Sequence, residues 1–142
     1  MSVVASDIRA ALAAALSSGI SSQIQCTGYM LSDPTPPAFE IEPAAVEYDQ
    51  AFNRGANWWT WTVRGFVASN SDMESQRLLD VWLAASGTGS VKAAIETDLT
   101  LGGKVDSLQV TSVSGPKLFE ARAMPNAAYF GAEWTVRILA GA

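Results

Sequence analysis

The chain has 142 residues, a hydrophobic share of 49% and a formal net charge of −5. This size fits one domain that buries roughly 68% of its unfolded surface. There is no histidine, which excludes Cys/His zinc sites and a histidine general base. The negative charge argues against a surface for duplex DNA, and no apolar run approaches the ~20 residues that span a bilayer.

A helix is the first predicted element. Ser6 can cap it, Gly19 can end it, and alanine fills most of its positions outside one apolar face. That face carries Ile8, Leu12 and Leu16. A strand over residues 22–30 follows. It contains Cys26, the single cysteine, which we expect to be a buried free thiol rather than a nucleophile.

A proline-rich connector at residues 32–37 leads into a predicted long hairpin. A rigid loop suits its three prolines better than a ligand for a proline-recognition domain. Apolar and acidic residues then alternate over 38–42 and 46–49, before a turn at 53–55. We expect the distal part of this hairpin, roughly residues 44–57, to overrun the domain. Because a lone two-stranded ribbon is marginally stable, it should contact a partner; a long mobile loop is the alternative.

The strongest strand pattern covers residues 58–69, where aromatic and β-branched residues recur at every second position. One face would carry Trp59, Trp61, Val63 and Val67, and the other Thr60, Thr62 and Arg64. The tetrapeptide Trp-Thr-Val-Arg at 61–64 recurs at 134–137. We interpret the two copies as strands of one sheet whose Trp and Val face a helix-covered core, with a chance match as the alternative.

The second half of the sequence predicts two helices and further strands. A capping-box pattern at 71–74 opens a helix over 72–85, and Ser90 caps a short helix. The apolar stripe of the longer helix is Leu78, Leu79, Trp82 and Leu83. The Gly-rich segment 86–92 lacks the spacing of a phosphate loop, so we interpret it as two helix caps. After a turn at 101–103, strands are expected at 107–114, 117–124 and 129–139, with a bend at 115–116.

This order predicts a single α+β domain over residues 1–142, with one mostly antiparallel sheet, helices on one face and a long protruding hairpin. Catalytic groups are scarce. Glu40 with Glu42, and Glu47 with Asp49, could pair to hold a proton or a cation, but a solvent-facing strand explains them more simply. No nucleophile motif is present, so we expect no enzyme and assign no catalytic, cofactor or metal residue.

Several segments in order resemble the tail terminator proteins of long-tailed, non-contractile (siphovirus-type) phages that infect actinobacteria. They cover nearly the whole chain: residues 29–37, 47–51, 54–55, 59–67, 87–95, 101–103 and 131–136. The resemblance implies a sheet backed by helices that forms a hexameric ring, without cofactor or catalysis. Such a ring ends the polymerisation of the tail tube and joins the tail to the head.

The expected partners are therefore other copies of the chain, the major tail tube protein and the connector or stopper of the head. DNA would only pass through, and no membrane is involved. The expected location is the neck of the virion, after assembly in the host cytoplasm. Another neck component, such as a head-tail stopper or a tail-completion protein, is an alternative. A small-ligand-binding α+β domain with a tryptophan-lined pocket is the alternative from another class.

Two sets of residues are candidates for such a role. Ring closure needs heterologous contacts, for which the hairpin residues Tyr48, Phe52, Arg54 and Trp58 could pack on a neighbour's sheet or alanine-rich first helix. Six copies at −5 each would carry −30 around the channel. Four acids, Glu40, Glu42, Glu47 and Asp49, are predicted to approach the channel and repel DNA; the alternative is that acidity only aids solubility.

Overall fold

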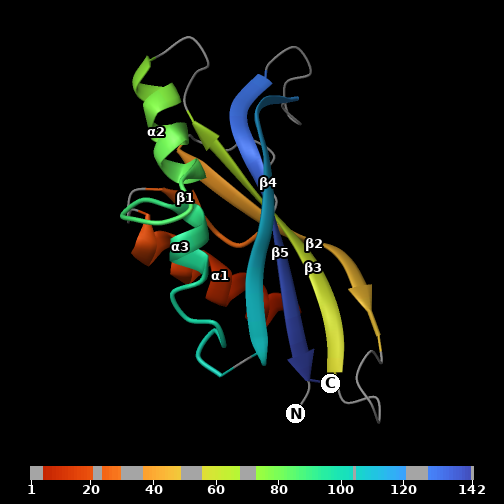
Figure 1. Ribbon diagram of the computed structural model, residues 1–142. Helices are drawn as coiled ribbons and strands as arrows, with labels where there is room; N and C mark the ends of the chain where they lie inside the picture. The colour runs from red at the N-terminus through yellow and green to blue at the C-terminus, as the bar shows by residue number, and fades with distance from the viewer. Residues whose placement is uncertain are drawn as a thin grey trace.

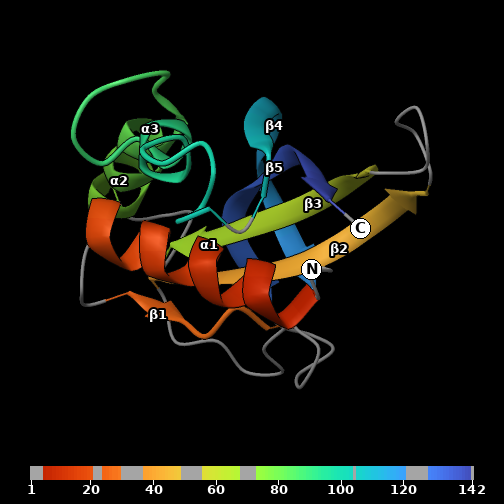
Figure 2. The same cartoon turned by 90° about the horizontal axis from the view of Figure 1, so that it is seen from below.

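The computed structural model describes residues 5–20, 24–29, 37–48, 56–67, 73–103, 105–120 and 128–141. The elements in chain order are α1 (Ala5–Gly19), β1 (Gln25–Cys26), β2 (Ala38–Glu47), β3 (Ala56–Val67), α2 (Met73–Leu83), α3 (Val91–Ile95), β4 (Ser107–Glu120) and β5 (Ala128–Gly141). The strands form one sheet in the order β1-β2-β3-β5-β4. The three helices lie on the same side of this sheet (Figures 1 and 2).

The predicted α+β class and the mostly antiparallel sheet are confirmed, and one parallel pair makes the sheet mixed. β1 pairs with β2 in parallel, and the other three neighbouring pairs are antiparallel. β1 is also much shorter than the strand expected over 22–30. Only its two residues pair with β2, so the local pattern overestimated its length. None of the described helices is long and apolar enough to cross a bilayer.

The repeated tetrapeptide lies at the centre of the fold. β3 and β5 are antiparallel neighbours, and their register places Trp61 opposite Val136 and Val63 opposite Trp134. All four side chains are buried, and they join the core cluster that includes residues of the helices. The interpretation of the two copies as neighbouring strands that face a common core is therefore confirmed.

The aromatic core is completed by the helix α2. The ring of Trp82 lies 4.6 Å from that of Phe39 on β2, and the Phe39 ring lies 6.2 Å from that of Trp134. Of the predicted stripe of α2, Leu79 and Trp82 are buried, whereas Leu78 is 37% exposed. The stripe is therefore narrower than predicted, because α2 meets the rest of the fold along one side only.

α1 packs through the predicted face, whose three residues have no exposed surface: Ile8, Leu12 and Leu16. Arg9 ties this helix to the sheet, because its Nη1 donates to the carbonyl oxygens of Gly28 at 2.9 Å and Ile41 at 2.6 Å. α3 begins as predicted, with the Ser90 hydroxyl accepting from the backbone N–H of Ala93 at 3.1 Å. The capping-box residues 71–72 lie outside the described residues.

Two further expectations about strands are corrected. Residues 107–120 form one strand, β4, in which 115–116 are accommodated by a register shift between Ser114 and Lys117 instead of separating two strands. The distal hairpin is also not a lone ribbon in its described part. β3 pairs with β5 from its first residue, with Ala56 opposite Gly141, so β5 supports the ribbon as a third strand. Residues 49–55 of the hairpin lie outside the described part of the chain.

Candidate interaction surface on the sheet

A row of alternating charges crosses the sheet face that the helices leave uncovered. We call Glu42, Arg64, Glu133 and Lys117 the charged row; they come from β2, β3, β5 and β4. Arg64 Nε donates to Glu133 Oε2 at 2.6 Å, and Lys117 Nζ donates to Glu133 Oε1 at 2.7 Å. Arg64 Nη1 donates to Glu42 and lies 3.5 Å from Glu40 Oε1. The guanidinium of Arg64 thus connects three strands of the sheet.

Two members of the charged row, Glu133 and Arg64, have pKa values that are shifted toward the ionised state. Burial raises the pKa of Glu133, but hydrogen bonds and charges from Lys117 and Arg64 outweigh this effect, so its pKa lies below the ordinary value. Burial lowers the pKa of Arg64, yet Glu42 and Glu133 bring it above its ordinary value. A carboxylate held ionised in this way is a poor proton donor at neutral pH. The row therefore suits structural support better than acid-base catalysis.

A second group lies at the distal end of the hairpin, where Trp58 and Arg137 are on this face and Tyr48 follows Glu47, the register partner of Trp58. We call Tyr48, Trp58 and Arg137 the distal cluster. The Arg137 guanidinium carbon lies 4.4 Å from the centre of the Trp58 ring, and Tyr48 is 66% exposed. Arg137 Nη2 is 3.8 Å from Glu47 Oε2, and both side chains are about half exposed. Tyrosine, tryptophan and arginine are the residues that dominate binding energy at protein interfaces.

The acidic residues predicted to approach the channel differ in their exposure in the structure. Glu40 has no exposed surface, so its prediction as a channel-facing residue is wrong: the carboxylate lies near Arg64 within the fold. Glu42 is mostly covered in the charged row, whereas Glu47 is exposed. Asp49 lies outside the described residues.

Of the four predicted interface residues, the structure describes two and leaves two outside its described residues. Tyr48 is exposed and Trp58 is half-buried, and both lie at the end of the sheet where Glu47 pairs with Trp58. Phe52 and Arg54 lie outside the described residues. Sequence reasoning missed Arg137 as a partner of Trp58. The signal was available, because Arg64 and Arg137 occupy the same position in the repeated tetrapeptide, and both bind acids on the helix-free face.

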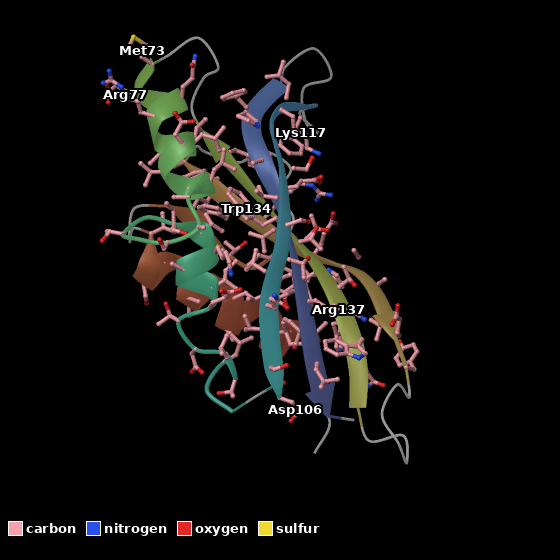
Figure 3. The ribbon with its side chains drawn as sticks, viewed as in Figure 1. Met73, Arg77, Asp106, Lys117, Trp134 and Arg137 are labelled. Carbon is pink, nitrogen blue, oxygen red and sulfur yellow. The ribbon has the colours of Figure 1, made fainter. Side chains whose placement is uncertain are left out.

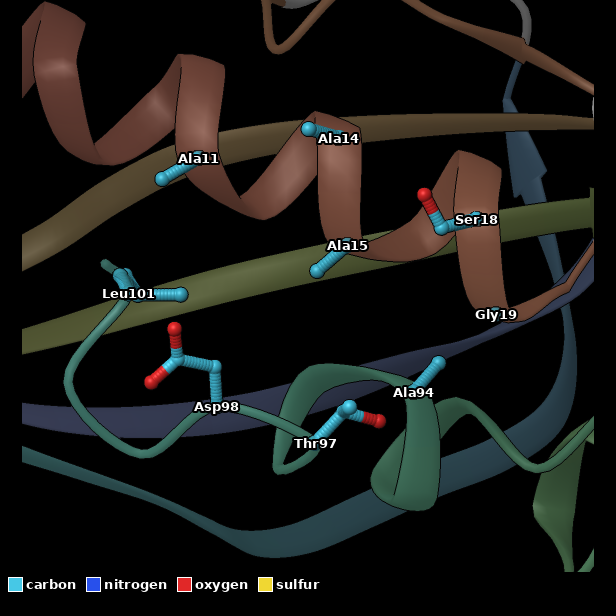
Figure 4. A pocket seen from close by; sticks show the side chains of 9 residues that line it. All are labelled: Ala11, Ala14, Ala15, Ser18, Gly19, Ala94, Thr97, Asp98 and Leu101. Carbon is cyan, nitrogen blue, oxygen red and sulfur yellow. The ribbon is translucent and has the colours of Figure 1, made fainter.

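A groove of about 470 Å³ lies between α1 and α3 (Figure 4). Its walls are mainly small side chains: Ala11, Ala14, Ala15, Ser18, Gly19, Ala94, Thr97, Asp98 and Leu101. The Asp98 carboxylate accepts from the backbone N–H groups of Thr100 at 3.0 Å and Gly102 at 2.7 Å. These hydrogen bonds lower the pKa of Asp98, so its carboxylate stabilises the adjoining turn.

Neither a metal centre nor a reactive thiol is found in the described residues. No three acidic or cysteine side chains there are grouped in a way that could hold a metal ion. Cys26 is free and half-buried, and burial raises the pKa of its thiol to about 11, although a backbone hydrogen bond near Gly28 opposes the shift. Comparison of the chain with models of known protein families finds no match, and comparison with curated proteins finds none either.

Proposed function

We propose that this protein is a tail terminator of a long-tailed, non-contractile phage. In this proposal six copies form a ring at the head-proximal end of the tail tube, end its polymerisation and offer the surface that joins the head connector. The partners are further copies of the chain, the major tail tube protein and the connector, and DNA only passes through. The protein is assembled in the host cytoplasm and remains in the neck of the virion.

The observation that carries the proposal is the distal cluster. Tyr48 and Arg137 are exposed and Trp58 is half-buried against Arg137, and all three are interface-type residues at one end of the sheet. The charged row is suited to support rather than to catalysis. The ordered resemblance over nearly the whole chain supports the same role. A tryptophan-lined ligand pocket has less support, because Trp61, Trp82 and Trp134 are at most 1% exposed and pack in the core.

Of the proposed channel residues, Glu47 and Asp49 remain the main candidates, with Glu42 mostly neutralised by Arg64. Their charge would keep DNA from adhering to the ring during passage. The double variant Glu47→Lys with Asp49→Lys should slow DNA ejection from assembled virions. Ejection at the parent rate would remove the channel role without affecting the terminator proposal.

Tail length tests the function directly. Lysates of the phage with this gene deleted should contain headless tails that are longer than those of the parent by electron microscopy. Tails of normal length that fail to join heads would assign the chain to a stopper or tail-completion role. Normal virions would overturn the proposal of a neck protein altogether.

A further inference from the structure

β4 is an edge strand, and its outer edge is open along part of its length. The sheet order is β1-β2-β3-β5-β4, so β4 pairs with β5 on one side and with no described strand on the other. Asp106 and Lys117 mark its course in Figure 3. An open edge presents unpaired backbone N–H and C=O groups, to which a strand of another molecule can add.

Two hollows show where this edge is accessible. One has a volume of about 460 Å³ and is lined by three successive residues of β4, Ser107, Leu108 and Gln109. The other has a volume of about 180 Å³ and is lined by residues 110–113. Successive residues of a strand point to opposite faces of the sheet, so a hollow lined by all of them lies along the edge of the strand. The accessible part of the edge therefore spans residues 107–113.

A glutamate side chain occupies a hydrogen-bonding position in the middle of this edge. Glu96 lies at the C-terminal end of α3, and its Oε2 accepts from the backbone N–H of Val110 at 2.9 Å. Val110 lies opposite Val136 of β5, yet its N–H points away from β5 to this carboxylate. The carboxylate thus takes the place that a backbone carbonyl oxygen of an added strand would need.

Lys92 holds the Glu96 carboxylate in this position. The two residues are about one helical turn apart, and Lys92 Nζ donates to Glu96 Oε1 while Oε2 accepts from Val110. Burial raises the pKa of Glu96, but the bonds from Lys92 and Val110 outweigh this effect and bring its pKa below the ordinary value. The acceptor is therefore ionised at neutral pH, and a hydrogen bond to a charged acceptor is stronger than a neutral one.

Other features of β4 disfavour strand addition along the same edge. The register with β5 shifts at Thr111, which is an extra residue, and shifts again at 115–116. Pro116 has no backbone N–H to donate, and Lys117 carries a charge. Bulges, proline and charged residues, lysine above all, are the features by which natural sheets protect their edge strands.

We infer that Glu96 protects the open edge of β4: its carboxylate occupies the hydrogen-bonding position of Val110 and prevents a strand of a second molecule from adding to the sheet. Docking of an extended peptide in the same hollows has less support. An added strand would displace the carboxylate from Val110 and would meet the extra residue Thr111. The inference does not rest on the proposed ring, and it predicts that copies assemble through surfaces other than this edge.

Hydrogen exchange of the Val110 amide in the full chain tests the contact. Glu96→Ala removes the acceptor and should speed this exchange by about tenfold or more, while the Val63 amide in the middle of β3 keeps its rate. Glu96→Gln keeps an oxygen acceptor and should retain part of the protection. Glu74→Ala is the matched control, because it also removes a carboxylate from an ion pair, here with Arg77.

Two results of this experiment would overturn the inference. One is parent-like exchange of the Val110 amide in Glu96→Ala, which would show that the carboxylate does not protect it. The other is equal acceleration of the Val110 and Val63 amides, which would reveal a general loss of stability instead of a local contact. Glu74→Ala should exchange at the parent rate at both amides.

Light scattering at increasing protein concentration tests the consequence for association. Glu96→Ala should form species larger than those of the parent at the same concentration, because the uncovered edge pairs between molecules. Adding Thr111→Lys, which places a charge at an exposed position of the same edge, should reverse this association. A parent-like size at every concentration, or larger species that Thr111→Lys does not reverse, would reject the protective role.

These outcomes are independent of the proposed function. Normal virions after gene deletion would reject the terminator role and leave the protection of the edge intact. Parent-like exchange and association of Glu96→Ala would reject only the protection of the edge.

Discussion

Replacing Arg64 by methionine should destabilise the fold strongly, although the residue lies outside the apolar core. Methionine keeps an apolar stem but removes the guanidinium that contacts Glu40, Glu42 and Glu133. Removing one partner of a buried ion pair typically costs about 3–5 kcal/mol, because the other charge stays buried. The Arg64 side chain is 19% exposed, so solvent relieves part of this cost. We expect a loss of about 2–4 kcal/mol in the free energy of unfolding at neutral pH.

The pH dependence of this loss has a definite sign. Because the folded-state pKa of Glu133 is lowered, its carboxylate stabilises the fold above the unfolded pKa of about 4.3. That stabilisation disappears as the pH falls through the lower folded-state pKa. In the Arg64→Met variant Glu133 loses one of its two cations and protonates more readily. The stability difference between parent and variant should therefore stay constant from neutral pH down to about pH 4 and shrink as the pH falls further.

Urea unfolding followed by tryptophan fluorescence would measure both effects, since the buried tryptophans report on the core. Arg77→Met is the matched control. Its ion pair with Glu74 is exposed, with side chains 65% and 78% accessible, so the expected loss is below about 0.5 kcal/mol. Equal losses in the two variants, or an Arg64 effect that does not change with pH, would refute the assigned role of the charged row.

Three further changes test other parts of the fold. Gly65→Ala should cost about 1–3 kcal/mol, because the new Cβ would lie 2.6 Å from a ring carbon of Phe39; a parent-like urea midpoint would contradict this packing. Ser90→Ala should cost about 1 kcal/mol by removing the acceptor for the Ala93 N–H and the donor to the Ala84 carbonyl, and Ser90→Thr, which keeps the hydroxyl, should recover part of it in the same assay. The Cys26 thiol, with a pKa of about 11, should react with iodoacetamide slowly at pH 8. Unfolding in urea should accelerate it about 100-fold, and equal rates in the two states would exclude the burial.

Local sequence determined the elements whose pattern is complete within a few residues. The face of α1, the cap at Ser90 and the inward Trp and Val of the repeated tetrapeptide were all predicted correctly. Each depends on helix or strand periodicity, or on a side chain bonding a backbone group three residues away. These short-range effects act in almost any tertiary context.

The candidate surfaces were decided by the tertiary structure. Arg64 and Glu133 are 69 positions apart, and only the register of β3 with β5 brings them together. The pairing of β4 with β5 makes β4 one strand, the pairing of β2 with β3 places Glu40 beside Arg64, and the pairing of β3 with β5 brings Arg137 to Trp58. The sequence shows that these residues face away from the core. Strand order and register decide which acidic side chain pairs with which basic one, since these contacts join residues on different strands.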